Sequence, residues 1–142
     1  MNSEILKMAI PVLKPLFIIV SIWLLIRGLN YPGGGFMAGL IAGSSFVLEF
    51  LAFDKLVLTR KRRNQALIFI TLGIVLVLFS ALAGLFIKGH LLEGLWVNAY
   101  LPEIEFSLKL GTPLVFNIGI YFSILGFVYI VFTSMMEEWI WK

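Results

Sequence analysis

The chain has 142 residues, of which 61% are hydrophobic and 13% are charged, and its mean hydropathy is +1.02. Soluble domains are roughly half apolar and about a quarter charged, so this composition excludes a soluble globular protein and indicates an integral membrane protein. Cysteine is absent, which excludes disulfides, zinc thiolate sites and iron–sulfur ligation within the chain.

Four apolar segments are long enough to cross a bilayer, which requires about 20 residues per helix. The segments are continuously apolar, whereas membrane β-strands alternate between apolar and polar residues. We therefore expect an all-α integral membrane protein: one bundle of four transmembrane helices within a single domain, residues 1–142, with no soluble domain. The predicted spans are residues 10–29, 34–53, 66–87 and 113–136.

The first segment is interrupted by Lys14 and Pro15 near its start and carries Arg27 near its end. Its basic N-terminus invites comparison with a secretory signal, but no small-residue cleavage pattern follows the apolar run. Arg27 is interpreted mainly as an anchor at the membrane interface.

A glycine-rich turn follows, within the stretch "RGLNYPGGGFMAG". Glycine tolerates positive φ and close approach, and irregular backbone at membrane depth must be covered by protein or by a water-filled cavity. Two interpretations stay open: an ordinary tight turn, or a turn that borders an ion or water path with Phe36 as an apolar plug. The turn is not a phosphate loop, because the Gly-Lys-Ser/Thr ending is missing. It consists of Pro32, Gly33, Gly34, Gly35 and Phe36.

The second segment repeats glycine every four residues, at Gly35, Gly39 and Gly43. Small residues at this spacing form one helical stripe that lets a neighbouring helix approach closely. Glu49 lies about one turn before the end of the segment, and an ionisable group at such depth is a functional candidate. We expect Glu49 to snorkel or to form a structural ion pair with cations of the next connection; the alternative is a proton or cation relay.

Basic residues distinguish the two longer connections. One contains "DKLVLTRKRRNQ", whereas residues 88–112 contain only Lys88 and Lys109 against three glutamates. The positive-inside rule places the basic connection in the cytoplasm, so both termini are predicted to be cytoplasmic and the glycine-rich turn external. A basic run can also bind nucleic acid or acidic lipid, but the topological interpretation is preferred and no nucleic-acid partner is expected.

The last two segments also carry small residues at helical spacing. Packing against neighbouring helices is predicted for Ser80 and Gly84 in the third segment and for Gly119 and Gly126 in the fourth.

Thr112 and Pro113 suit an N-cap and a first helical position. Asn117, one turn into that helix, could ligate a cation, although a hydrogen bond to an adjacent helix is preferred. His90 is interpreted as a solvated loop residue. One histidine, no cysteine and no carboxylates clustered on one helical face provide neither a metal site nor a catalytic pair. We expect no cofactor and no enzymatic activity within this chain.

The stretch "RGLNYPGGGFMAGLI", followed late in the chain by "LGTPLVFNIGIYFSILG", resembles the B subunit of Mrp-type multisubunit sodium/proton antiporters. Membrane-bound hydrogenase-type complexes contain a similar module. The resemblance implies a subunit of a hetero-oligomeric Na⁺/proton antiporter in the cell membrane, in contact with lipid and with other antiporter subunits that provide the proton-carrying residues. It matches residues 32–36 to the family's signature turn and residues 111–113 to its second motif.

The chain departs from the family pattern at three positions. Leu29 stands where the family usually has histidine, Tyr31 where it has a small residue, and Asn117 where it has aspartate. The last change removes a negative charge that could have served a cation path, and Glu49 is not part of the pattern.

Three functions are therefore considered. The preferred one is an antiporter subunit that borders the ion path and supports assembly through glycine-lined contacts with companion subunits. The second is the equivalent subunit of a redox-driven membrane complex. The third is a self-sufficient homodimeric transporter, for which Glu49 is the only candidate coupling residue.

Overall fold

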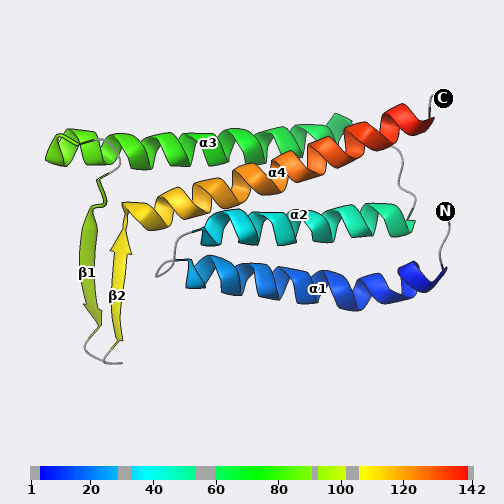
Figure 1. The fold of residues 1–142 in the computed structure, drawn as a ribbon, viewed down its shortest axis with the longest axis horizontal. Coiled ribbons are helices and arrows are strands. Elements are labelled where there is room, and N and C mark those ends of the chain that lie inside the picture. Colours follow the sequence, from blue (N-terminus) through cyan, green and yellow to red (C-terminus); the bar gives the residue numbers. More distant parts are fainter. Residues whose placement is uncertain (1–3, 29–32, 54–59, 91–92, 102–105, 141–142) are drawn as a thin grey trace.

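A computed structural model describes residues 4–28, 33–53, 60–90, 93–101 and 106–140 (Figure 1). Four helices form its main part, and each is long and apolar enough to cross a membrane. The prediction of a four-helix membrane protein is confirmed. The helices are α1 (Glu4–Arg27), α2 (Gly34–Phe53), α3 (Arg60–Lys88) and α4 (Thr112–Ile140).

Three helices extend beyond their predicted spans. Helix α1 begins at Glu4 and includes Pro11 and Pro15, and α4 continues to Ile140. Helix α3 begins at Arg60, so four basic residues assigned to the connection belong to its first turns. Hydropathy marks only the part of a helix inside the apolar layer, whereas arginine and lysine are good helix formers that allow the helix to continue into water.

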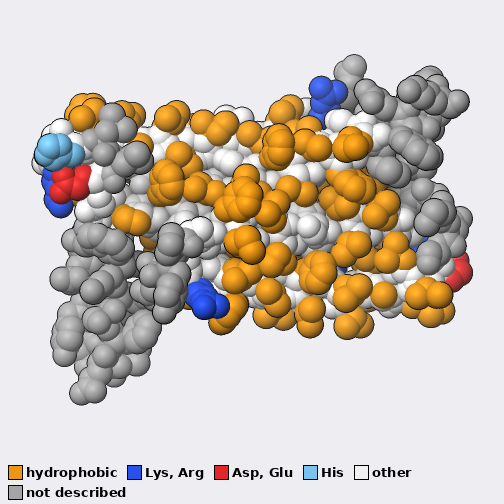
Figure 2. All heavy atoms as spheres, in the orientation of Figure 1, with side chains coloured by type: hydrophobic (Ala, Val, Ile, Leu, Met, Phe, Trp, Pro, Cys, Tyr) orange, Lys and Arg blue, Asp and Glu red, His pale blue; other side chains and the backbone are white. Residues whose placement is uncertain are grey.

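The helices of the bundle pack in the spatial order α1, α2, α4, α3, as a row (Figure 1). Helix α2 is the most enclosed: 50% of its span is buried, compared with 11% for α1 and 17% each for α3 and α4. Apolar side chains cover the visible face of the row (Figure 2). The outer faces of α1 and α3 therefore meet either lipid or companion subunits.

Both termini lie at one end of the row, and the α1–α2 turn lies at the other (Figure 1). This placement follows from an even number of antiparallel crossings. Which end faces the cytoplasm stays a prediction.

A two-stranded antiparallel hairpin occupies part of the connection between α3 and α4, where we predicted no strand. It consists of β1 (Trp96–Leu101) and β2 (Phe106–Gly111). Figure 1 shows the strands running across the helix ends. The alternation of apolar and other residues in the sequence of β2, "FSLKLG", is a strand signal from which β2 could have been predicted.

Thr112 joins the hairpin to α4. Its N–H donates to the Leu95 carbonyl at 3.0 Å, and its hydroxyl accepts from the Leu95 N–H, also at 3.0 Å. The hydroxyl that was predicted to cap α4 therefore bonds to the residue before β1.

Candidate functional site

The glycine stripe of α2 lies against α4. A Cβ atom on Gly39 would lie 2.8 Å from the Tyr121 carbonyl oxygen, and one on Gly43 would lie 2.9 Å from the Val128 Cβ. Gly35 contacts the backbone of Asn117 in the same way. The stripe brings two helices of this chain together, so the expectation that it contacts companion subunits is wrong.

A second interface of small residues joins α4 to α3. A Cβ on Gly119 would lie 2.8 Å from the Gly73 carbonyl oxygen, and one on Gly126 would lie 2.7 Å from the Ala66 carbonyl oxygen. Gly73 is a contact residue that we did not predict. The sequence did contain a signal for this contact. Gly73 lies seven residues before Ser80, and residues at that spacing lie on the same face of a helix.

The other small residues of α3 lie near its end. The Ser80 hydroxyl donates to the Thr112 carbonyl at 2.6 Å and ties α3 to the start of α4. The nearest atoms to a Cβ on Gly84 are backbone atoms of His90 and Glu93, in the segment that follows α3. The four-residue spacing thus indicated close packing at both positions but not the element that each contacts.

The glycine-rich turn is held at the junction of α1, α2 and α4. Gly28 and Gly34 meet backbone to backbone, and Asn117 Nδ2 donates to the Gly28 carbonyl at 3.0 Å. In a continuing helix that carbonyl would accept from the N–H of residue 32, but residue 32 is proline and has none. Asn117 therefore supplies the hydrogen-bond donor that a proline at position 32 lacks.

Gly33 adopts a φ of 88°, a left-handed conformation that favours glycine. Phe36, in the first turn of α2, is 47% exposed, and Met37 beside it is 53% exposed. Phe36 therefore projects from the surface of this chain and does not fill a space within it. Pro32 lies outside the described residues.

Glu49 forms an ion pair with Lys14 of α1, with 2.9 Å between Nζ and Oε2. The Lys14 ammonium also lies 5.1 Å from the centroid of the Phe46 ring, which adds a cation–π attraction. A structural ion pair was the preferred prediction for Glu49, but its partner comes from the first helix instead of the basic connection.

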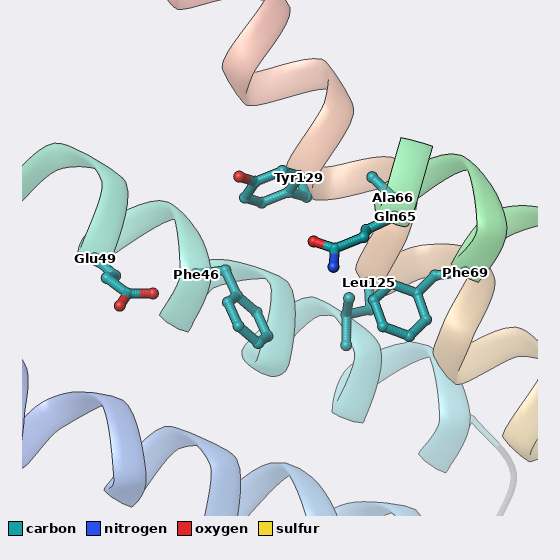
Figure 3. A pocket seen from close by; sticks show the side chains of 7 residues that line it. All are labelled: Phe46, Glu49, Gln65, Ala66, Phe69, Leu125 and Tyr129. Atoms are coloured by element: carbon teal, nitrogen blue, oxygen red, sulfur yellow. The ribbon is translucent and has the colours of Figure 1, made fainter. Parts of the chain in front are cut away.

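A cavity of about 240 Å³, which is open to the surface on one side, lies beside Glu49, between α2, α3 and α4 (Figure 3). The polar groups that line it are the Glu49 carboxylate, the Gln65 amide and the Tyr129 hydroxyl. Neither Gln65 nor Tyr129 was predicted, because nothing in the spacing of residues on three helices shows that they face one space. The remaining lining residues are Phe46, Ala66, Phe69 and Leu125.

The remaining candidates are Arg27, which directly precedes Gly28 of the turn, and His90. The Arg27 guanidinium lies 5.4 Å from the Trp23 ring centroid at the end of α1, and His90 is exposed. Within the described ranges, no group of three or more His, Asp or Glu side chains could hold a metal ion.

Comparisons with known proteins all point to one family of antiporter subunits. Residues 5–130 match the family model described as a domain related to the MnhB subunit of Na⁺/H⁺ antiporter. The chain is similar to the B subunit of the Na⁺/H⁺ antiporter of Bacillus subtilis, with 29% identity covering 96% of this chain and 95% of the relative. The B subunit of the Na⁺/H⁺ antiporter of Alkalihalophilus pseudofirmus is 26% identical, over 96% of this chain and 94% of its own length. A putative antiporter subunit mnhB2 of Staphylococcus aureus is 28% identical over 94% of each chain.

Proposed function

The chain belongs to the family of the MnhB subunit of Na⁺/H⁺ antiporters, and we propose that it is a membrane subunit of a multisubunit sodium/proton antiporter. In this role it takes part in transport and catalyses no reaction of its own. Companion subunits cover part of its apolar surface, and Na⁺ is the transported cargo.

The observation that carries the proposal is the family match over residues 5–130. It includes α1 to α3, the hairpin and most of α4, so it concerns the whole membrane domain and not one motif. The relatives named as antiporter subunits match over almost their full lengths, which agrees with one shared architecture.

We further propose that the turn borders the ion path of the complex. Phe36 supports this role because its ring is about half exposed beside a backbone junction that three helices hold in place. An exposed aromatic ring at this junction can line a path that the chain shares with a companion subunit.

The test uses an affinity-tagged chain in the native complex and its Phe36→Ala variant. We expect the tagged chain to co-purify with other antiporter subunits, and vesicles with the wild-type complex to exchange Na⁺ for protons. The variant should retain its partners but exchange about tenfold more slowly, which corresponds to about 1.4 kcal/mol. Partner identity is measured by mass spectrometry, and exchange by the decay of an imposed pH gradient on Na⁺ addition.

Phe79→Ala is the matched control, because Phe79 is 66% exposed on α3, and α3 lies at the opposite edge of the row from α1 (Figure 1). Normal exchange by a fully assembled Phe36→Ala complex would refute the role of the turn. Co-purified iron–sulfur or nickel subunits would instead indicate a redox-driven complex, and an active homodimer would indicate a self-sufficient transporter.

A further inference from the structure

The cavity beside Glu49 has the properties of a hydrated space. Its volume of about 240 Å³ holds several water molecules at about 30 Å³ each. Its polar groups come from three helices: the Glu49 carboxylate from α2, the Gln65 amide from α3 and the Tyr129 hydroxyl from α4 (Figure 3). A cavity with this room and several polar groups is able to hold water.

The cavity lies near one end of the membrane domain. Glu49 is about one helical turn before the end of α2, and Gln65 is little more than one turn after the start of α3. Both helix ends adjoin the connection over residues 54–59. The cavity therefore lies toward the end of the row that also contains the two termini (Figure 1).

The ion pair between Lys14 and Glu49 is only partly buried within this chain. The two side chains are 33% and 29% exposed, so this chain does not enclose the pair. A fully buried charge that loses its partner is strongly destabilising, but a hydrated pair can separate and re-form. The carboxylate can therefore change partners.

We propose that this cavity is a hydrated inlet in which a monovalent cation binds Glu49 in competition with the Lys14 ammonium. A monovalent cation that takes the place of the ammonium neutralises the carboxylate, and the displaced Lys14 ammonium moves to the outer side of α1 through its exposed flank, where it is 33% exposed. Carboxylate and hydroxyl oxygens are ligands that hard cations prefer, and Gln65 lines the same cavity. The choice of Na⁺ as this cation rests on the proposed function.

Cysteine labelling tests the inlet directly, because the chain has no cysteine of its own. Gln65→Cys in the assembled complex should react with a membrane-impermeant cationic thiol reagent at least about tenfold faster than Leu72→Cys, because only a hydrated thiol ionises to the reactive thiolate. Leu72 is the control because it is 45% exposed on α3 among apolar neighbours and does not line the cavity.

Sodium chloride should slow the labelling of Gln65→Cys relative to choline chloride at equal ionic strength. This protection should disappear when Glu49→Gln is added. Equal labelling of the two cysteine variants would overturn the hydrated inlet. Protection that persists without the Glu49 charge, or no protection at all, would overturn the cation site.

Transport kinetics provide a second readout that a purely structural ion pair would not reproduce. Glu49→Gln should raise the KM for Na⁺ by about tenfold, because a charge-assisted contact is lost. Lys14→Gln should lower the KM, because the competing ammonium is gone. Equal losses of kcat in both variants without opposite changes in KM would mean that the pair only supports the fold.

The matched control is Glu4→Gln, which breaks the exposed Lys7–Glu4 pair of α1 and should leave the KM unchanged. The two proposals fail in different ways. If the wild-type complex does not exchange Na⁺ for protons, the proposed function fails, whereas Na⁺ protection of Gln65→Cys still reports on the cavity.

Discussion

At the scale of single residues, Asn117 connects positions that lie far apart in the sequence. Its amide donates to the Gly28 carbonyl at 3.0 Å, and Pro32 has no N–H for that carbonyl. An unpaired carbonyl at membrane depth costs several kcal/mol. The amide at position 117 therefore has a structural role that a carboxylate, which only accepts hydrogen bonds when ionised, does not fulfil.

We predict that Asn117→Asp destabilises the complex, because it removes the donor and places a carboxylate beside the Gly28 carbonyl. The expected loss is about 1–3 kcal/mol for an acceptor left unpaired. It is measured as a lower midpoint of thermal unfolding of the purified complex. Asn64→Asp on the exposed start of α3 makes the same chemical change and should have little effect. Equal midpoints for the two variants would contradict the role of the hydrogen bond.

At the scale of elements, small residues set the distances between helices. Helix α2 approaches α4 through Gly39 and Gly43, and α4 approaches α3 through Gly119 and Gly126. Close approach is favourable in lipid because dispersion contacts, and not a hydrophobic drive, hold membrane helices together. Helix α2 thereby becomes the enclosed element of the row.

We expect Gly39→Leu to separate α2 from α4. Even its Cβ would lie 2.8 Å from the Tyr121 carbonyl oxygen and 2.9 Å from the Ile124 Cβ, so the backbone must move. Overpacking of this kind costs about 1–3 kcal/mol. The change is measured as a lower detergent-resistant yield of complex after heating. Met37→Leu, on an exposed position of the same helix, is the control, and a yield equal to that control would show that the interface adapts.

At the scale of the whole molecule, the row leaves broad apolar surfaces on α1 and α3. Its two ends consist of different segments. One end has the termini and the α2–α3 connection, and the other has the turn and the hairpin (Figure 1). Because the basic residues begin α3, the positive-inside rule predicts that the first end faces the cytoplasm.

Orientation is tested with single cysteines at exposed positions of the two ends. An impermeant thiol reagent added to intact cells should label His90→Cys and not Asn64→Cys, and inside-out vesicles should reverse the pattern. Asn64 lies in the first turns of α3, His90 follows the end of the same helix, and both are exposed. Labelling of Asn64→Cys in intact cells would invert the predicted topology.

Much of the fold could be predicted because its signals are local. The free energy of transferring a segment into lipid depends on the residues of that segment, and this local property was sufficient for four spans. The parts of α1, α3 and α4 that extend beyond their predicted spans were missed, because hydropathy identifies only the apolar part of a helix. The hairpin was missed although the alternation in "FSLKLG" was readable.

The sequence by itself determined the membrane class, the four crossings, the faces on which Gly39 or Gly119 lie, and the resemblance to antiporter subunits. Only the tertiary structure decided what each face meets. Lys14 and Glu49 are 35 residues apart, and Asn117 and Gly28 are 89 residues apart. Helical spacing specifies a direction from the helix axis, whereas the group that lies in that direction depends on which helices become neighbours, and that follows from the packing of the whole chain.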